Sequence, residues 1–323
     1  MTGFLVIDKP PGITSHDVVA VVRAVTGIKK VGHTGTLDPF ATGVLPLALG
    51  GATRLIQFLD ESIKIYDATI ALGTATDTGD PTGPVIDTKP LPTVDEEAVE
   101  AALRGFVGER MQTPPKYSAV KHKGRPLYQY ARMGQEVKVA ARKITIHDME
   151  LKEYDREKLR VLITCGRGTY ARVLADEVAE AIGTAGHLAD LARLRSGPFF
   201  YDDALTMPHL AELVSAEENK TWEEVLLGRG PREERVKWKH RDEVMDGLKP
   251  FFKRPLDVLS HLPLVDVNPV DVKRIRSGGV APLPPAGLAG QGVFLVVCGD
   301  ELIAVAQQSG RGTRIVKVVD KPR

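Results

Sequence analysis

The chain is poor in cysteine, and this shortage excludes several kinds of protein. Its 323 residues include only two cysteines, Cys165 and Cys298. Two thiols can form neither a disulfide framework nor a four-thiolate zinc site. Each lies in an apolar run, where a buried thiol is the simplest interpretation. We therefore expect a reducing, cytoplasmic environment.

Long apolar runs are also missing. The charged residues Asp8 and Lys9 come too early for the apolar part of a signal peptide. The longest uncharged run, residues 277–299, is interrupted by three prolines and several glycines, which indicates a loop followed by a strand. The sequence therefore predicts no association with a membrane.

The chain has almost no net charge. Its 43 Lys and Arg residues nearly balance 42 Asp and Glu residues, so the formal net charge is +1. This balance excludes a histone-like polycation, but a local basic patch would still suffice for nucleic-acid binding. Hydrophobic residues make up 43% and charged residues 26%, which excludes a largely disordered chain. The length favours about two domains.

Short apolar stretches and glycine turns predict an α+β fold with a mixed, mainly antiparallel sheet. We expect strands over residues 3–7, 64–72 and 159–164. The second strand alternates between apolar and polar residues, with Tyr66 on its apolar face. Residues 74–84 are expected to form a turn-rich loop.

Start and stop signals predict three helices in the first two thirds of the chain. One begins at Thr14 or Ser15 and ends at Gly27, with valines at helical spacing on one face. Another opens with a capping box at Thr93. A third spans residues 169–182 and ends at a glycine.

The composition changes after residue 203 and divides the chain into three parts. We expect a first domain over residues 1–205, a charged helical insert or linker over residues 206–255, and a small domain over residues 256–323. Short strands separated by glycine turns in the last part fit a small C-terminal β-barrel.

Residues 32–46 concentrate glycines and hydroxyl side chains around His33 and Asp38. The stretch lacks the lysine of a Walker loop and the Gly-x-Gly-x-x-Gly pattern of dinucleotide-binding proteins. Asp-Pro is also a common start of an ordinary turn. The glycine-rich and apolar setting makes Asp38 a candidate catalytic carboxylate, with a structural turn as the alternative.

Residues 116–143 carry eight Lys and Arg residues against a single acid, Glu136. Tyrosines interleave with these cations. Because basic groups neutralise phosphates and aromatic rings stack on bases, the stretch predicts a contact with RNA or DNA. The alternative is a solvated surface, which usually carries both signs of charge. The candidate RNA-binding residues are Lys116, Tyr117, Lys121, Lys123, Arg125, Arg132, Arg142 and Lys143.

Residues 165–172 combine the end of a strand, a glycine turn and the start of a helix. Arg172, in the first turn of that helix, could reach a carboxylate. Taken alone, the pattern is more typical of an ordinary strand-turn-helix with surface arginines.

Seven motifs, taken in order, resemble the TruB family of tRNA pseudouridine synthases. They are residues 8–15, 32–46, 64–66, 73–80, 112–134, 168–172 and 191–194. The resemblance covers residues 3–205 strongly, and the C-terminal barrel is more weakly similar to a PUA domain. Two features depart from the family: Ala192 stands where an arginine is common, and the charged segment 217–246 has no evident counterpart.

The resemblance implies an isomerase with a pseudouridine synthase fold that converts uridine 55 in the T-arm of tRNA to pseudouridine. It implies that residues 1–205 form the catalytic domain and that residues 112–143 contact RNA. The implied roles are Asp38 as the nucleophile, Arg172 as its cation, Tyr66 as the ring stacked on the base, Leu194 as an apolar wall, and His33 as the group that fills the place the uridine leaves. No cofactor, metal or guide RNA is implied, and we expect a monomer.

Three other functions compete with this interpretation. A guide-dependent synthase of the dyskerin branch shares the motif around Asp38, but residues 40–43 and the lack of a long basic tail favour a stand-alone enzyme. A non-catalytic RNA-folding protein would not need Asp38, Tyr66 and Arg172 together. A hydrolase using His33, Asp38 and Ser118 lacks the Gly-x-Ser-x-Gly pattern around its serine.

Overall fold

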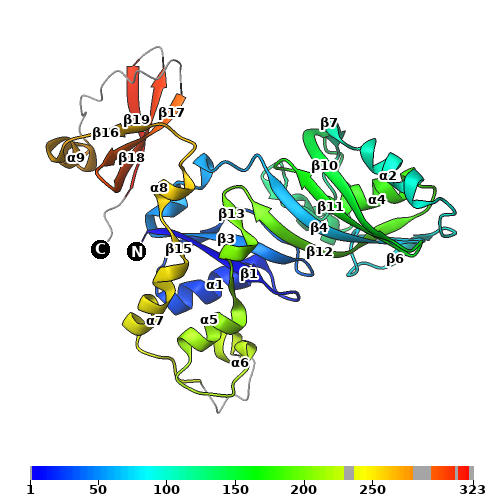
Figure 1. Ribbon diagram of the computed structural model, residues 1–323, viewed down its shortest axis with the longest axis horizontal. Helices are drawn as coiled ribbons and strands as arrows, with labels where there is room; N and C mark the ends of the chain where they lie inside the picture. The colour runs from blue at the N-terminus through cyan, green and yellow to red at the C-terminus, as the bar shows by residue number, and fades with distance from the viewer. Residues whose placement is uncertain (1, 229–235, 279–291, 310–311, 320–323) are drawn as a thin grey trace. The chain divides into compact units, whose positions relative to one another are not determined.

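The computed structural model describes residues 2–228, 236–278, 292–309 and 312–319, and the chain divides into two compact units (Figure 1). Unit 1 comprises Met1–Asp38, Val44–Asp60 and Pro198–Arg323; unit 2 comprises Pro39–Gly43 and Glu61–Gly197. Both units combine helices with strands, so the expected α+β class is confirmed. The chain enters unit 2 for the first time directly after Asp38.

One group of strands in unit 1 is arranged around β1 and β3. β1 (Gly3–Lys9) pairs in parallel with β14 (Leu205–Thr206) and antiparallel with β15 (Phe252–Lys253). β2 (Val31–His33) and β3 (Thr42–Leu49) form an antiparallel hairpin. The first five residues of β1, residues 3–7, are apolar or small and buried, as expected for a core strand.

Helix α1 (Ser15–Thr26) has the start and the stop that the sequence predicts. Thr14 is its N-cap and forms a capping box with Asp17, and Gly27 ends the helix in the left-handed conformation at φ 64°. The predicted apolar face is buried and consists of Val18, Val21, Val22 and Val25.

The described part of residues 206–255, the predicted charged helical insert or linker, contains three α-helices. They are α5 (Met207–Val214), α6 (Trp222–Leu227) and α7 (Arg241–Leu248). Helix α7 contacts α1, and the guanidinium of Arg241 donates to the carbonyl of Thr26 at 2.9 Å. This cation satisfies a carbonyl at the end of α1. Residues 229–235 lie outside the described residues.

Short helical elements and one short strand complete this unit outside its C-terminal sheet. They are η1 (Gly50–Arg54), η2 (Ile56–Phe58), β13 (Phe199–Phe200), η3 (Tyr201–Asp203), η4 (Lys249–Phe251) and α8 (Pro255–Val258).

The C-terminal part forms an open sheet, so the prediction of a closed β-barrel is not confirmed. Among the described residues the strand order is β16 (Leu264–Asp266), β17 (Gly292–Cys298), β18 (Glu301–Ser309) and β19 (Gly312–Val318), with β16 and β19 at the two edges. Helix α9 (Pro269–Arg276) packs on one face of this sheet.

The opposite face of the C-terminal sheet shares a core with the N-terminal strands. Leu295 and Val305 pack in one cluster with Phe4, Val6 and Val44. One face of the sheet is therefore buried under α9, and the other is buried against β1 and β3. Since both apolar faces are already covered, the strands do not need to close into a barrel to bury them.

The main sheet of unit 2 is built from antiparallel strands. Its strand order is β12 (Gly186–Ser196), β4 (Lys64–Leu72), β11 (Lys158–Cys165), β10 (Arg142–Tyr154) and β7 (Gly108–Gln112). All four neighbouring pairs run antiparallel. The predicted strand over residues 64–72 has the same bounds in the structure, and its buried face includes Tyr66.

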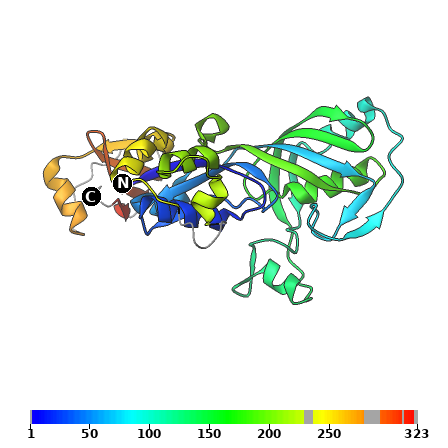
Figure 2. The same cartoon turned by 90° about the horizontal axis from the view of Figure 1, so that it is seen from below.

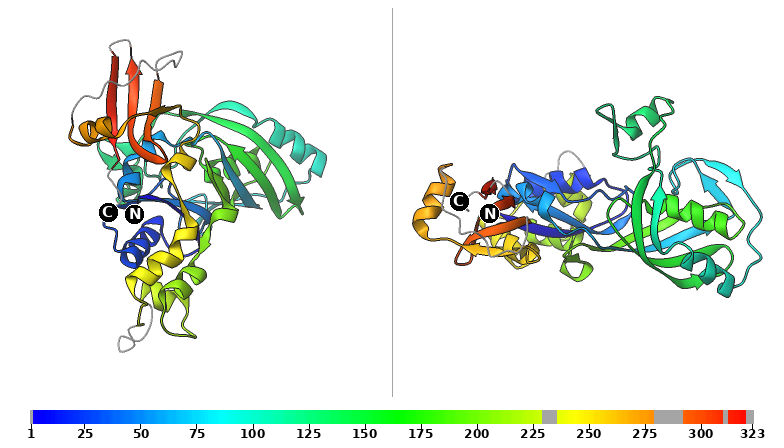
Figure 3. Two further views of the ribbon diagram at one scale, coloured as in Figure 1. Left: turned by 60° about the vertical axis from the view of Figure 1, so that its left-hand side comes forward. Right: turned by 90° about the horizontal axis from the view of Figure 1, so that it is seen from above.

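Two helices cover one face of this sheet (Figures 1 and 3). Helix α4 (Ala171–Ala181) packs on β12 and β4, and α2 (Glu96–Arg104) packs on β10 and α4. The predicted capping box at Thr93 is wrong, because the N-cap of α2 is Asp95, whose carboxylate accepts the N–H of Ala98 at 2.9 Å.

Two smaller groups of elements in unit 2 lie outside its main sheet. The turn-rich segment 74–84 contains β5 (Thr74–Thr76), which pairs with β6 (Val85–Thr88). The basic stretch contains β8 (Lys121–His122), β9 (Arg125–Pro126) and α3 (Leu127–Arg132). Figures 2 and 3 show this second group projecting from the sheet. None of the helices in the described ranges is long and apolar enough to cross a membrane.

Candidate active site

Asp38 lies in the loop that joins β2 to β3, and a serine of α1 fixes the residue before it. The hydroxyl of Ser15 accepts the N–H of Leu37 at 2.9 Å and donates to the carbonyl of Leu37 at 3.1 Å. Both residues are buried, whereas Asp38 is half-buried. At the base of the loop, the N–H of Thr34 donates to the carbonyl of Pro46 at 3.0 Å. The carboxylate is therefore carried by a well-anchored turn.

His33, the last residue of β2, lies in unit 1 with Asp38. Its ring meets the ring of His16 edge-on, with centroids 5.4 Å apart and an interplanar angle of 74°. His16 belongs to α1, so the same helix supports both His33 and the residue before Asp38.

Five residues after Asp38, a glycine allows two strands of unit 2 to approach closely. Gly43 has φ +93°, and a Cβ added there would lie 2.3 Å from the carbonyl oxygen of Arg193. No side chain fits at that distance, so residue 43 must be glycine. In the sheet register, Arg193 faces Gly43 on one side and Tyr66 on the other. Gly43, Arg193 and Tyr66 thus form one row across three strands.

Tyr66 shares a face of the sheet with residues of β12. It is 8% exposed, and its neighbour on that face of β4, Ala68, is paired with Leu191. Directly paired residues point to the same face, so Leu191 joins Tyr66 there. Leu194 is half-buried and is the extra residue of an irregularity between Arg193 and Arg195. The sequence singled out Leu194 and missed Leu191, because only the pairing of β12 with β4 distinguishes them.

Arg172 is buried, which excludes the interpretation of an ordinary surface arginine. It is 5% exposed in the first turn of α4. Its guanidinium donates to the carbonyls of Thr78 and Tyr117, each at 2.8 Å, and lies 3.7 Å from a carboxylate oxygen of Asp80. One side chain therefore joins α4, the segment 74–84 and the start of the basic stretch.

Asp80 organises the segment that receives Arg172. One of its carboxylate oxygens accepts the hydroxyl of Thr78 at 2.7 Å and the N–H of Thr82 at 3.0 Å. Gly79 has φ +71°, and a Cβ there would lie 3.3 Å from the Cβ of Arg172. Asp80 is 5% exposed and faces a buried cation. Asp80 belongs to the motif of residues 73–80, in which no local pattern distinguishes it from Asp77.

Asp77 holds the first residues of the basic stretch. Its carboxylate forms an ion pair with Lys116 and accepts the hydroxyl of Tyr117 at 3.1 Å. The hydrogen bond from Lys116 lowers the pKa of Asp77. At the other end of the stretch, Lys143 pairs with Glu109 at 2.7 Å. Acids from elsewhere thus neutralise two of the eight cations, and the local sequence overstates the positive charge.

Apart from Lys116 and Tyr117, the predicted RNA-binding residues fall into two groups in the structure. Lys121, Lys123, Arg125 and Arg132 are exposed on the projecting group of β8, β9 and α3, where Arg132 lies 5.5 Å from the ring centroid of Tyr128. Arg142 and Lys143 instead begin β10 and are exposed on the sheet.

A half-buried amine, that of Lys64, and a buried thiol, that of Cys165, lie side by side near Tyr66. Lys64 and Cys165 are paired residues of β4 and β11. Burial lowers the pKa of Lys64, and Glu61, 4.0 Å away, partly offsets this effect. Burial raises the pKa of Cys165 to about 11. Cys165 is therefore a protonated structural thiol, as its apolar setting suggests.

Comparisons with known proteins agree with the motifs. Residues 23–171 match the model of the TruB family pseudouridylate synthase N-terminal domain. The tRNA pseudouridine synthase B of Chromohalobacter salexigens is 40% identical over 290 residues, which cover 90% of this chain and 84% of that protein. The protein of the same name from Bacillus licheniformis is 39% identical over 319 residues, covering 97% and 92%. That from Geobacter sulfurreducens is 48% identical over 216 residues, covering 67% and 71%.

A solved structure described as a Cbf5-Nop10-Gar1 complex contains a chain with a related fold. It matches 99% of this chain and 84% of that chain at 26% identity, with a TM-score of 0.65. The identity and coverage of the sequence relatives show that this chain belongs to the TruB family of pseudouridine synthases.

Proposed function

We propose that this isomerase converts uridine 55 in the T-arm of tRNA to pseudouridine, with Asp38 as the nucleophile and without a guide RNA or cofactor. The observation that carries the proposal is the anchoring of the loop of Asp38 by Ser15 in a chain of this family. A nucleophile needs a fixed position relative to its target, and a serine held in a helix supplies it.

The reaction is an isomerisation within one nucleotide. The C1′–N1 bond breaks, the uracil turns, the C1′–C5 bond forms, and the proton on C5 leaves while N1 gains one. Nothing is oxidised or hydrolysed. A carboxylate suits this sequence because it is ionised at neutral pH and can leave after attack.

Arg172 is proposed to keep the carboxylate of Asp38 ionised. Burial alone favours the neutral acid, and a nearby cation favours the charged form. The guanidinium is fixed by two carbonyls and by Asp80, so it would stabilise negative charge without reorganising during the reaction. Asp80 would act through Arg172 as a positioning residue.

Tyr66 is proposed to stack on the target base, with a leucine of β12 as the apolar wall beside it. Leu194 is the residue predicted from the sequence. Leu191 is a second candidate, because the register places it on the face of Tyr66. His33 is proposed to fill the space left by the uridine when it leaves the RNA stack, as base-modifying enzymes require.

The projecting group of β8, β9 and α3 is proposed to dock on the T-arm through its exposed cations. Folded RNA is recognised largely through its shape and backbone, which suits a protruding basic element. The C-terminal sheet, proposed as PUA-like, would contact the acceptor stem. The monomeric state and the cytoplasmic location stay predictions of the sequence.

The position of modification can be tested directly. Unmodified tRNA transcript is incubated with the purified protein alone, treated with a carbodiimide that marks pseudouridine, and read by primer extension. We expect one stop, at position 55, that disappears when the transcript carries cytidine there. A stop elsewhere would contradict the proposed target, and a stop only after a guide RNA is added would favour the guide-dependent alternative.

A further inference from the structure

The projecting basic segment contains a pocket whose lining residues have no assigned role in the reaction. It has a volume of about 550 Å³, within the usual range for small-molecule sites. The pocket is lined by His122, Lys123, Tyr130, Gln135, Glu136, Val137 and Lys138. All of these residues belong to unit 2. They come from β8 and the turn after it, from α3, and from residues 135–138, which follow α3.

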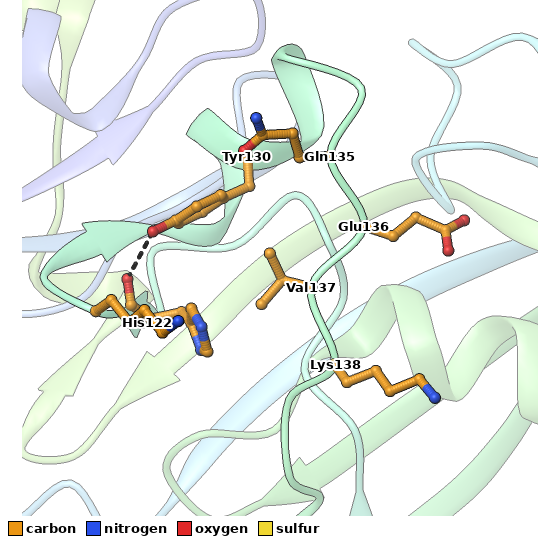
Figure 4. Close-up of a pocket in the computed structure, with 7 residues that line it drawn as sticks. His122, Tyr130, Gln135, Glu136, Val137 and Lys138 are labelled. Carbon is orange, nitrogen blue, oxygen red and sulfur yellow. Dashed lines mark hydrogen bonds between the residues drawn. The ribbon is translucent and has the colours of Figure 1, made fainter.

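The walls of this pocket are rings and an aliphatic side chain. The ring of His122 meets the ring of Tyr130 edge-on, with centroids 5.9 Å apart and an interplanar angle of 81°. Figure 4 shows Val137 pointing toward these two residues, whereas Glu136 and Lys138 point away from them. The result is a slot with an aromatic side and an aliphatic side.

The ring of Tyr130 is held in place before any ligand arrives. Its hydroxyl donates to the backbone carbonyl of His122 at 3.1 Å, which ties α3 to the β8 strand (Figure 4). Tyr130, His122 and Val137 are each half-buried, so part of each surface stays open to solvent. A pre-positioned ring loses little side-chain freedom when a flat ligand stacks on it.

The charge around the slot favours an anionic chain as the source of the flat ligand. Lys123 and Lys138 are exposed at the pocket, and Lys121 and Arg125 lie on the same small hairpin. Glu136 is the one acid that lines the pocket, and it points away from the rings. A planar apolar group flanked by phosphates is a nucleotide within a strand, so the matching ligand is one unstacked base of an RNA.

We propose that the slot between Tyr130 and Val137 binds one unpaired base of the substrate RNA, at a position other than the uridine that is isomerised. This inference rests on the proposed function for the identity of the RNA. The second base would give the projecting segment a fixed register on the substrate, in addition to the non-directional attraction of its cations. Because no residue lining the slot has an assigned role in the isomerisation, we expect the slot to act on affinity and to leave the turnover of bound RNA unchanged.

The test combines variants of the slot with RNAs that lack single bases. Transcripts are prepared with an abasic residue at each unpaired position of the T-arm in turn, and their dissociation constants are measured by filter binding. For the unaltered protein, we expect one abasic position other than the target to weaken binding by about fivefold or more. In Tyr130→Leu the same abasic position should cost nothing, because the ring that stacked on the base is gone.

Two further variants separate stacking from folding. Tyr130→Phe loses the hydrogen bond to His122 and keeps the ring, so it should keep the abasic penalty and bind only slightly more weakly than the unaltered protein. Val137→Trp fills the slot while Tyr130 stays, so it should weaken binding and abolish the penalty. Tyr154→Leu is the matched control, because the Tyr154 hydroxyl donates to the carbonyl of Val94 at the same 3.1 Å but lies outside the pocket.

The outcomes decide the matter independently of catalysis. An abasic penalty that vanishes in Tyr130→Leu and Val137→Trp but persists in Tyr130→Phe and Tyr154→Leu supports the slot. The proposal is overturned if no abasic penalty depends on Tyr130, or if Tyr130→Phe behaves like Tyr130→Leu. If RNA is modified normally but no such coupling exists, only the slot fails. If the RNA binds but is never modified, the proposed function fails and the slot is judged on the binding data.

Discussion

The hydroxyl of Ser15 bonds both the N–H and the carbonyl of Leu37, across 22 residues of sequence. This pair joins the first turn of α1 to the loop that carries Asp38. A motif at the start of the chain and a second motif around Asp38 thus form one physical unit. The proposed nucleophile is held by hydrogen bonds to its neighbour in the chain.

Replacing Ser15 should therefore reduce turnover. Ser15→Ala leaves the N–H and carbonyl of buried Leu37 without their partner and loosens the loop of Asp38. A misplacement of about 1 Å can cost about 100-fold in rate, so we expect kcat to fall by about tenfold to 100-fold. The change is measured as the rate of pseudouridine formation at saturating tRNA.

Thr14→Ala is the matched control for Ser15. Thr14 caps the same helix but bonds Asp17 instead of Leu37. Its loss should lower the free energy of unfolding by about 1 kcal/mol and leave kcat unchanged. Equal losses of kcat in the two variants would show that only the stability of α1 matters.

Arg172→Lys should nearly abolish activity. A lysine cannot donate to the carbonyls of Thr78 and Tyr117 and also face Asp80, because it lacks the planar fork of the guanidinium. Loss of one fixed electrostatic contact in an active site costs about 100-fold to 1000-fold in rate. Arg160→Lys, at an exposed pair with Asp67, should leave activity unchanged. Comparable losses in both variants would contradict a special role for Arg172.

Gly43→Ala should disrupt the sheet of unit 2. Its Cβ would overlap the carbonyl of Arg193, at a residue whose φ is already +93°. Gly12→Ala carries the strain of φ +83° with no atom within 4 Å, and should cost only about 1 kcal/mol. We expect a much larger drop in melting temperature for Gly43→Ala. Similar melting temperatures would show that β3 and β12 can separate without harm.

The two leucines of β12 can be distinguished by kinetics. Leu191→Ala should lower kcat/KM by about tenfold, because an apolar contact in a substrate pocket contributes at this scale. Leu194→Ala should have a smaller effect, since Leu194 is the extra residue of the strand irregularity. A larger loss of kcat/KM in Leu194→Ala would show that Leu194, the residue predicted from the sequence, forms the apolar wall.

Cys165 should make stability depend on alkaline pH. The ordinary pKa of a thiol is 9.0, and burial raises that of Cys165 to about 11. Between these two values the unfolded chain loses a proton that the folded chain retains, so stability should fall as pH rises from 9 to 11. Cys165→Ala should remove that part of the fall in thermal melts. A profile identical to that of the unaltered protein would contradict a buried thiol.

Much of the fold follows from local patterns in the sequence. The alternation around Tyr66 predicts β4 with its correct bounds, and Thr14 and Gly27 predict both ends of α1. The choice of Thr93 as a cap fails, because Asp95 competes for the same helix start and its carboxylate makes the bond. Local signals predict a helix end reliably where only one nearby residue can serve as the cap. They are weaker where two residues can, as at the start of α2.

The parts that could not be predicted depend on contacts between distant segments. Asp77 neutralises Lys116 across 39 residues, so a count of charges within one stretch could not reveal it. Asp80 is recognised as a candidate site residue only because it faces Arg172. Leu191 is recognised only because the register of β12 places it on the same face of the sheet as Tyr66. The C-terminal strands were expected to close into a barrel, but α9 and the N-terminal strands cover their two faces and leave an open layer.

The central claim is that Asp38 carries out the isomerisation in a stand-alone enzyme. The most direct measurement uses unmodified tRNA transcript labelled with tritium at C5 of uridine, because forming the C1′–C5 bond must release that label. We predict release by the unaltered protein alone, and none by Asp38→Asn, which should still bind the tRNA. Release by Asp38→Asn at the unaltered rate, or no release by the unaltered protein despite tight binding, would contradict the account.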